Sequence, residues 1–312
     1  MTCPAESTSE LGALFSGIRP GQPVRVGGLD LIPLLGGGGG PEADLLEEGI
    51  AEGVTSVEEV SESGAVGRLR VSHTGKRPLL VVDGEQVIGA KQNRIFNASF
   101  LVSPGSTVEL PVSCVEQRRW HYDRSRDFTS SGTTLTSSAR RAKLHRVTAS
   151  AIRRNSYAAD QSAVWQDVDD YLERTSVTST TSAFSDGYTS RSMVVEQLLP
   201  RLQPVQGQVG LAALWDGKLV TLDVFGSASL YARGWRKVAR GVLGELYGGR
   251  VRRPPEQSLA TVQRLLGDLT RAKAVRKDAP GGGHTLHGSV RGAVYGAISD
   301  GGRIYHAVLA GS

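Results

Sequence analysis

The stretch PLLVVDGEQVIGAKQNRIFNASFLV, from Pro78 to Val102, begins as a β-hairpin and then departs from that pattern. Leu79–Val82 is an apolar strand, and Val87-Ile88 starts the return strand. Asp83-Gly84 between them is a hairpin turn sequence, because glycine accepts the positive φ of a tight turn. Four consecutive polar residues then follow: Lys91, Gln92, Asn93 and Arg94. A half-buried strand should alternate instead, so the stretch predicts a hairpin that ends in a dense block of donors and positive charge.

The segments on either side of this hairpin also have strand patterns, and residues 20–120 are therefore expected to be mainly β. Strands are expected at 24–35, 55–61, 67–72, 95–102 and 107–115, with one short helix near 43–52. Pro104-Gly105 is the expected turn between the last two strands.

The pattern changes after residue 122. Residues 123–137 and 176–190 are rich in Ser and Thr and are interpreted as loops. Apolar residues recur at helical spacing from Ser138, and a second helix is expected at Asp160–Arg174 with Asp160 as its cap. The last third is expected to hold two hairpins, turning at Asp216-Gly217 and Asp300-Gly301, with two helices between them.

The predicted fold class is α+β, with a β-rich N-terminal half, a helical middle segment, and β-hairpins with two helices in the C-terminal third. The expected divisions within one compact unit are a disordered N-terminus at 1–23, a β-rich subdomain at 24–122, a loop and helical segment at 123–190, and an α+β subdomain at 191–312.

Composition indicates a soluble globular protein and excludes several classes. The 312 residues are 39% hydrophobic and 21% charged, and the net charge of +5 is too mild to indicate a nucleic-acid partner. Cys3 and Cys114 give no disulfide framework and no zinc spacing. No metal site and no cofactor motif is predicted, and His284 and His287 alone are a weak metal pattern. The first residues lack a signal-peptide pattern and no apolar run could span a membrane, so a cytoplasmic location is expected.

The polar block Lys91–Arg94 is the first candidate site. Arginine offers a planar fork for carboxylate or phosphate, lysine offers a compact charge, and the amides of Gln92 and Asn93 could bind a ribose or a base edge. A solvated strand end is the alternative interpretation, and the sequence leaves both open.

The segment SCVEQRRWHY, Ser113 to Tyr122, is the second candidate site. In a strand, Cys114, Glu116 and Arg118 share one face, so Cys114 is a candidate nucleophile and Glu116 a candidate acid/base. No base for Cys114 is evident, and buried cysteines are commonly inert. Gln117, Arg118 and Trp120 are candidate ligand-binding residues, and the alternative for Trp120 is packing.

The motifs DGEQVIGAKQNR (83–94), PVSCVEQRRW (111–120), YAADQSAVWQDV (157–168) and LDVFGSASLYARGWRKVAR (222–240) occur in this order. Together they resemble the ADP-ribosylglycohydrolase- and rhodanese-phosphatase-associated protein family, first domain type, from about residue 24 to the end of the chain. The resemblance implies a genomic link of this bacterial family to NAD and ADP-ribose metabolism. It brings no catalytic residues, so the site residues rest on their own chemistry.

Three classes of function follow from these motifs. The leading hypothesis is a cytoplasmic binding protein for a nucleotide or ADP-ribose-like anion, held by Lys91 and Arg94. The second is an enzyme acting on such a ligand through Glu116 or Cys114. The third is a structural or self-associating protein, a homo-oligomer, in which the two polar blocks pair with each other across neighbouring strands.

Overall fold

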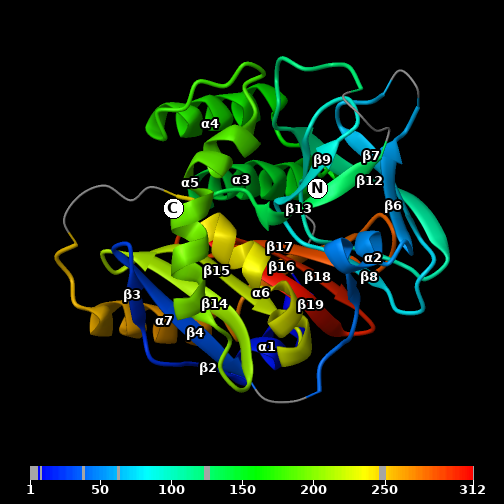
Figure 1. The fold of residues 1–312 in the computed structure, drawn as a ribbon. Helices are drawn as coiled ribbons and strands as arrows, with labels where there is room; N and C mark the ends of the chain where they lie inside the picture. The colour runs from blue at the N-terminus through cyan, green and yellow to red at the C-terminus, as the bar shows by residue number, and fades with distance from the viewer. Residues whose placement is uncertain are drawn as a thin grey trace.

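The computed structural model describes residues 6–7, 9–36, 39–61, 64–122, 127–245 and 251–311. Within these ranges the predicted α+β class is confirmed, with a large antiparallel sheet, a smaller six-stranded sheet and a three-stranded sheet (Figure 1). Cys3 and residues 123–126 of the first predicted loop lie outside the described residues. None of the described helices is long and apolar enough to cross a membrane.

The large sheet combines strands from both ends of the chain. Its spatial order is β1 (Glu6–Ser7), β16 (Lys273–Asp278), β17 (His284–Val290), β18 (Ala293–Asp300), β19 (Arg303–Ala310), β15 (Lys218–Phe225), β14 (Gln208–Trp215), β4 (Leu29–Gly36) and β2 (Ile18–Pro20), with β3 (Val24–Val26) also paired to β4. The hairpins predicted at Asp216-Gly217 and Asp300-Gly301 are confirmed, because β14 pairs with β15 and β18 with β19.

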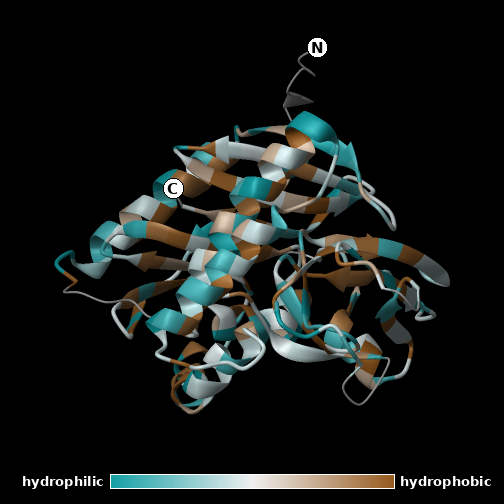
Figure 2. Cartoon of the chain, turned by 90° about the horizontal axis from the view of Figure 1, so that it is seen from above, coloured by the Kyte–Doolittle hydropathy of each residue, from teal (hydrophilic) through white to brown (hydrophobic). Residues whose placement is uncertain are grey.

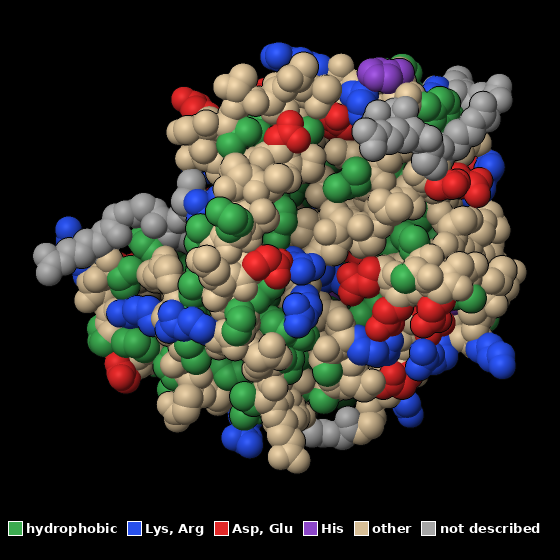
Figure 3. Space-filling view, in the orientation of Figure 1, with side chains coloured by type: hydrophobic (Ala, Val, Ile, Leu, Met, Phe, Trp, Pro, Cys, Tyr) green, Lys and Arg blue, Asp and Glu red, His purple; other side chains and the backbone are tan. Residues whose placement is uncertain are grey.

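Helices cover both faces of this sheet, because successive residues of its strands point to opposite faces and apolar residues lie on both. One set packs against α1 (Ser9–Ser16) and α7 (Pro255–Leu269), and the other against α6 (Ala228–Leu243) and α3 (Ser137–Arg154). Hydrophobic and hydrophilic residues accordingly alternate in bands along the strands and helices (Figure 2). Acidic and basic side chains are interspersed on the face shown in Figure 3.

The six-stranded sheet closes into a small barrel, at the upper right of Figure 1. Its order is β13 (Phe128–Thr134), β9 (Glu85–Gly89), β10 (Arg94–Phe96), β12 (Ser106–Cys114), β7 (Arg68–His73) and β6 (Thr55–Glu59), all neighbours antiparallel. A bridge between Glu58 and Asp127 joins the two outer strands. Val57, Val71, Val87 and Phe96 fill the interior, which is therefore packed rather than hollow.

The hairpin predicted at Asp83-Gly84 is wrong. The turn forms, with Gly84 at φ +73° and a hydrogen bond from the Glu85 N–H to the Val82 carbonyl. However, β8 (Leu79–Val81) pairs with β11 (Phe100–Val102) and β5 (Asp44–Leu45), whereas β9 belongs to the barrel. Asp83 is buried and needs cationic partners, which α3 supplies, so the turn carries the chain from one sheet into another.

Three segments expected to lack regular structure contain it. Residues 9–20 form α1 and β2, and Leu11 and Phe15 of α1 are buried against the large sheet. Strand β13 lies in the first segment interpreted as a loop, and helix α5 (Phe184–Leu198) begins in the second. Their Ser and Thr content hid them, because β13 is a polar barrel strand and α5 lacks a capping side chain at Ala183.

Two further helices are close to their predicted positions, α2 (Leu46–Ala51) and α4 (Gln161–Arg174). The 3₁₀ turn η1 (Leu199–Leu202) was not predicted. The Asp160 carboxylate caps α4 as expected, accepting hydrogen bonds from the N–H groups of Ser162 and Ala163.

Candidate functional site

Several polar side chains gather at one end of the barrel. Strands β6, β9 and β12 end there, at Glu59, Gly89 and Cys114, and β10 begins there at Arg94. These ends share one rim because neighbouring strands run antiparallel. We call this rim and the loops on it, carrying Glu59, Lys91, Arg94, Cys114, Glu116, Arg119 and Trp120, the barrel mouth.

Three of these side chains belong to the barrel interior. Arg94 lies two residues before Phe96 of the apolar core, and Cys114 follows Val112 in the same way. Side chains two residues apart share a face of a strand, so Arg94 and Cys114 point inward. They also lie directly opposite each other across β10 and β12. Glu59 follows Val57 with the same spacing and completes a polar layer at the end of the packed barrel.

Arg94 and Glu59 form an incompletely satisfied charge pair in this layer. Arg94 is 0% exposed and its Nη1 donates to Gln92 Oε1 at 2.7 Å. Its Nη2 lies 3.7 Å from Glu59 Oε1, beyond hydrogen-bonding distance. Within the described part of the chain, Nε and Nη2 of Arg94 and both carboxylate oxygens of Glu59 have no hydrogen-bond partner. Burial lowers the pKa of Arg94 against the attraction of neighbouring anionic groups.

Two aromatic rings cover the cations of the mouth. The Trp120 ring lies 5.3 Å from Lys91 Nζ and 5.6 Å from the Arg94 guanidinium carbon. Tyr122 lies 5.3 Å from the same Lys91 nitrogen. These are cation–π distances. Trp120 is 45% exposed, so its indole ring lies between the two cations and the solvent.

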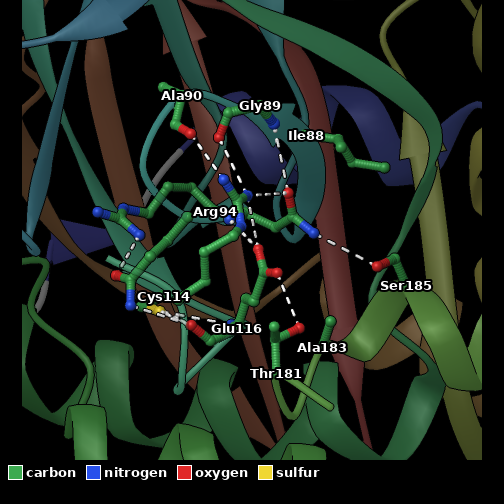
Figure 4. Close-up of polar contacts among 12 residues, drawn as sticks. Ile88, Gly89, Ala90, Arg94, Cys114, Glu116, Thr181, Ala183 and Ser185 are labelled. Carbon is green, nitrogen blue, oxygen red and sulfur yellow. Dashed lines mark hydrogen bonds and ion pairs between the residues drawn. The ribbon is translucent and has the colours of Figure 1, made fainter. Parts of the chain in front are cut away.

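The Glu116 carboxylate joins the two polar blocks of the sequence, which lie side by side (Figure 4). Its Oε2 accepts hydrogen bonds from the Asn93 N–H at 3.0 Å and from Arg119 Nη2 at 2.7 Å, and its Oε1 accepts from Thr181 Oγ1 at 2.9 Å. Burial alone would raise the pKa of Glu116, but these donors outweigh it and lower the pKa below its ordinary value. Glu116 is therefore an ionised, fully bonded anchor for Arg119, which also donates to the Ala90 carbonyl.

The other predicted site residues have varied positions. The thiol of Cys114 is buried, burial raises its pKa, and it donates to the Glu116 carbonyl at 3.3 Å. Gln92 Nε2 donates to the same carbonyl at 3.0 Å. Gln117 and Arg118 are exposed at the rim. A nucleophilic Cys114 needs a lowered pKa and an acid/base Glu116 needs a transferable proton, so both catalytic roles stay predictions from the sequence.

Glu59, Arg119 and Tyr122 are mouth residues that were not predicted from the sequence. Glu59 continues the inward spacing of Thr55 and Val57, which is the signal that could have found it. Arg119 has no such signal, because it lies in a loop and its partners Ala90 and Glu116 depend on the tertiary fold.

A second buried polar cluster joins α3, the turn before β9 and the large sheet. Arg140 donates through Nε to Asp83 at 2.9 Å and through both Nη atoms to Asp223 at 2.7 and 2.9 Å. Lys143 donates to the other Asp83 oxygen at 2.5 Å. Burial opposes the charge of Asp223, but Arg140 lowers the pKa of Asp223 to about 2. We call Asp83, Arg140, Lys143 and Asp223 the central ionic cluster.

A hydrogen-bonded relay extends from this cluster. His306 lies 3.1 Å from Asp223 through Nε2 and 2.8 Å from Ser99 Oγ through Nδ1. This order of groups is that of a hydrolase triad. All three residues are buried and Arg140 shares the same carboxylate, so the relay holds the barrel against the sheet.

Hollows and metal-like groups do not point to another site. A hollow of about 570 Å³ lies beside Tyr157 and Glu109, and one of about 320 Å³ beside Glu10 and Phe225. Neither is lined by the mouth residues. Among the described residues, no three His, Cys, Asp or Glu side chains are grouped to hold a metal ion. We therefore place the candidate site at the mouth, where the buried charges of Arg94 and Glu59 lack hydrogen-bond partners among the described residues.

These features define an α+β protein in which a closed barrel with a polar mouth is joined to a large antiparallel sheet. The chain belongs to the ARG and Rhodanese-Phosphatase-superfamily-associated Protein domain family, whose model matches residues 17–310. The match spans both the barrel and the sheet, and the family resemblance of the sequence motifs is confirmed. No curated protein and no solved structure matches the chain. The family name links the domain to ARG and rhodanese-phosphatase proteins.

Proposed function

We propose that the protein binds a small anion of the nucleotide or ADP-ribose type at the barrel mouth. The observation that carries the proposal is the buried Arg94 guanidinium, which has two donor nitrogens without hydrogen-bond partners among the described residues, beside a Glu59 carboxylate in the same condition. Buried polar groups in folded proteins are normally hydrogen-bonded, and a bound ligand would supply the partners that this pair lacks. Barrel mouths are also common sites for small ligands.

The Arg94 guanidinium and the Glu59 carboxylate would bind different chemical groups of one ligand. The free edge of Arg94 suits two oxygens of a phosphate, and Lys91 adds a second positive charge nearby. Glu59 accepts hydrogen bonds, so it suits the hydroxyl groups of a sugar. A sugar phosphate unit supplies both sets at neighbouring positions. The family name favours ADP-ribose among such ligands.

The remaining mouth residues position these groups in the proposal. Gln92 Oε1 accepts a hydrogen bond from Arg94, and Asn93 Oδ1 accepts one from Arg119 Nη2 at 3.3 Å, so Gln92 and Asn93 act as positioning residues. Gln117 and Arg118 face solvent and would contact outlying parts of a larger ligand. Turnover of the ligand, self-association and the cytoplasmic location stay predictions.

The test is a thermal-shift panel with ADP-ribose, NAD and nucleoside phosphates. Ligand at about a hundred times its dissociation constant adds roughly 2.7 kcal/mol to the free energy of unfolding, which is a shift of a few degrees. Arg94→Gln is expected to weaken binding roughly 10- to 100-fold, since a charge-assisted hydrogen bond contributes about 1.5–3 kcal/mol.

Two controls separate binding from folding and from general charge. Arg94→Gln combined with Glu59→Gln removes both buried charges, so the double variant should fold even where the single variant does not. Arg264→Gln removes the same charge from an exposed position on α7, away from the mouth, and should bind as wild type. No shift with any ligand, or an equal loss of binding in Arg264→Gln, would refute the proposal.

A further inference from the structure

Trp120 occupies a defined slot at the mouth. Its ring lies over Lys91 and Arg94, at 5.3 and 5.6 Å. The backbone of Gly64 lies against the indole, because a Cβ placed on Gly64 would be 3.3 Å from two of its ring carbons. The same Cβ would be 3.4 Å from Glu59 Oε2, so the slot opens directly onto the unsatisfied pair. A flat aromatic ring fits between this backbone and the two cations.

The indole is held in this slot by surface contacts. Trp120 is 45% exposed, and it lies in the loop after β12 rather than in the barrel core. Arg94 beneath it is 0% exposed, so a ligand that reaches Arg94 across this face must move the indole. Leaving the slot forfeits two cation–π contacts, which a second aromatic ring would restore.

We infer that Trp120 is an internal competitor for the ligand and that the ligand carries an aromatic base, which takes the place of the indole over Lys91 and Arg94. This inference rests on the proposed function. It assigns the base to the slot, the phosphate to the guanidinium edge and the sugar hydroxyls to Glu59. A sugar phosphate without a base displaces the indole without replacing its contacts, so it binds more weakly.

The test compares AMP with ribose 5-phosphate, which differ only by the base, on wild type and on Trp120→Ala by calorimetry. AMP should bind more tightly than ribose 5-phosphate to both proteins. Both ligands should bind roughly tenfold more tightly to Trp120→Ala, because neither has to displace the ring. Val205→Ala, at an exposed apolar residue before β14 and outside the mouth, should leave both affinities unchanged.

Three other outcomes would each refute a different part of this inference. Weaker AMP binding in Trp120→Ala would mean that the indole stacks on the ligand and is no competitor. Equal affinities of AMP and ribose 5-phosphate in both proteins would refute the base slot, with anion binding at the mouth intact. Absence of binding by every ligand to every variant would refute the proposed function itself.

Discussion

Replacing Arg140 by methionine should destabilise the protein more than most single substitutions. The change keeps an unbranched apolar stem but removes the guanidinium that bonds Asp83 and Asp223 in the central ionic cluster. Asp83 keeps the charged partner Lys143, and Asp223 keeps His306 and the hydroxyl of Thr221. The two carboxylates nevertheless stay buried with half their neutralising contacts, because both are at most 1% exposed.

The magnitude can be worked from Asp223. A pKa lowered to about 2, against about 3.9 in the unfolded chain, corresponds to about 2.6 kcal/mol at neutral pH. Arg140→Met should therefore cost about 3–5 kcal/mol, the range measured when one partner of a buried ion pair is removed. That is a large fraction of the roughly 5–15 kcal/mol of a folded domain.

The assay is urea unfolding followed by tryptophan fluorescence, with Arg141→Met as the matched control. Arg141 is the next residue on the same helix and is exposed, so its loss should change the free energy of unfolding by about 0.5 kcal/mol or less. The midpoint for Arg140→Met should fall well below that of the control at an unchanged slope.

The pH dependence gives a second check. A carboxyl group with a lowered pKa contributes stability above its unfolded pKa, and this contribution is lost as the pH falls through its folded pKa. The loss in free energy of unfolding caused by Arg140→Met, relative to wild type, should therefore be largest near neutral pH. It should shrink as the pH falls from about 4 to about 2. Equal midpoints for Arg140→Met and Arg141→Met would refute a stabilising role of the cluster.

Two other predictions concern helix packing and the buried thiol. Gly241→Ala in α6 should destabilise the protein, because its Cβ would lie 2.1 Å from Thr134 Oγ1. Gly267→Ala in α7 should stabilise it by about 0.5–1 kcal/mol, because the added Cβ would meet no described atom within 4 Å. Melting temperatures that shift in the same direction for both variants would contradict this contrast. In a Cys3→Ser background, Cys114 should react with thiol reagents far more slowly folded than in urea, because it is buried with a raised pKa, and equal rates would contradict that placement.

The three Asp-Gly turns show how far local sequence carries. Asp216 and Asp300 are not buried and need no charged partner in the core, so the hairpins that their turn sequences predict do form. Asp83 has the same local sequence but is buried, and its partners lie on a helix more than fifty residues further along the chain. No local pattern reveals that pairing, so the strand on each side of the turn was assigned to the wrong neighbour.

The residues of the mouth were predictable only in part, because local sequence does not show which strands become neighbours. The block Lys91–Arg94 is visible as a break in strand alternation, and the structure places it beside Glu116. Glu59 was missed because its proximity to Arg94 depends on which strand ends share a rim, and closure of the barrel by the Glu58–Asp127 bridge decides that. Periodicity reports the face of a strand but not its neighbours.

The pairing of β4 with β14 sets an order of events during synthesis. Leu31 of β4 faces Ala213 of β14, roughly 180 residues later in the chain. At about 5–20 residues per second, β4 lacks this partner for some tens of seconds after it is made, and its apolar sequence LDLIPLL offers an open strand edge during that time. Asp223 and His306 arrive later still, so the barrel cannot be fastened to the sheet before then. A chain that stops before Gln208 would therefore keep the β14-facing edge of β4 unpaired permanently, and such products should aggregate or be degraded rather than accumulate as a folded half.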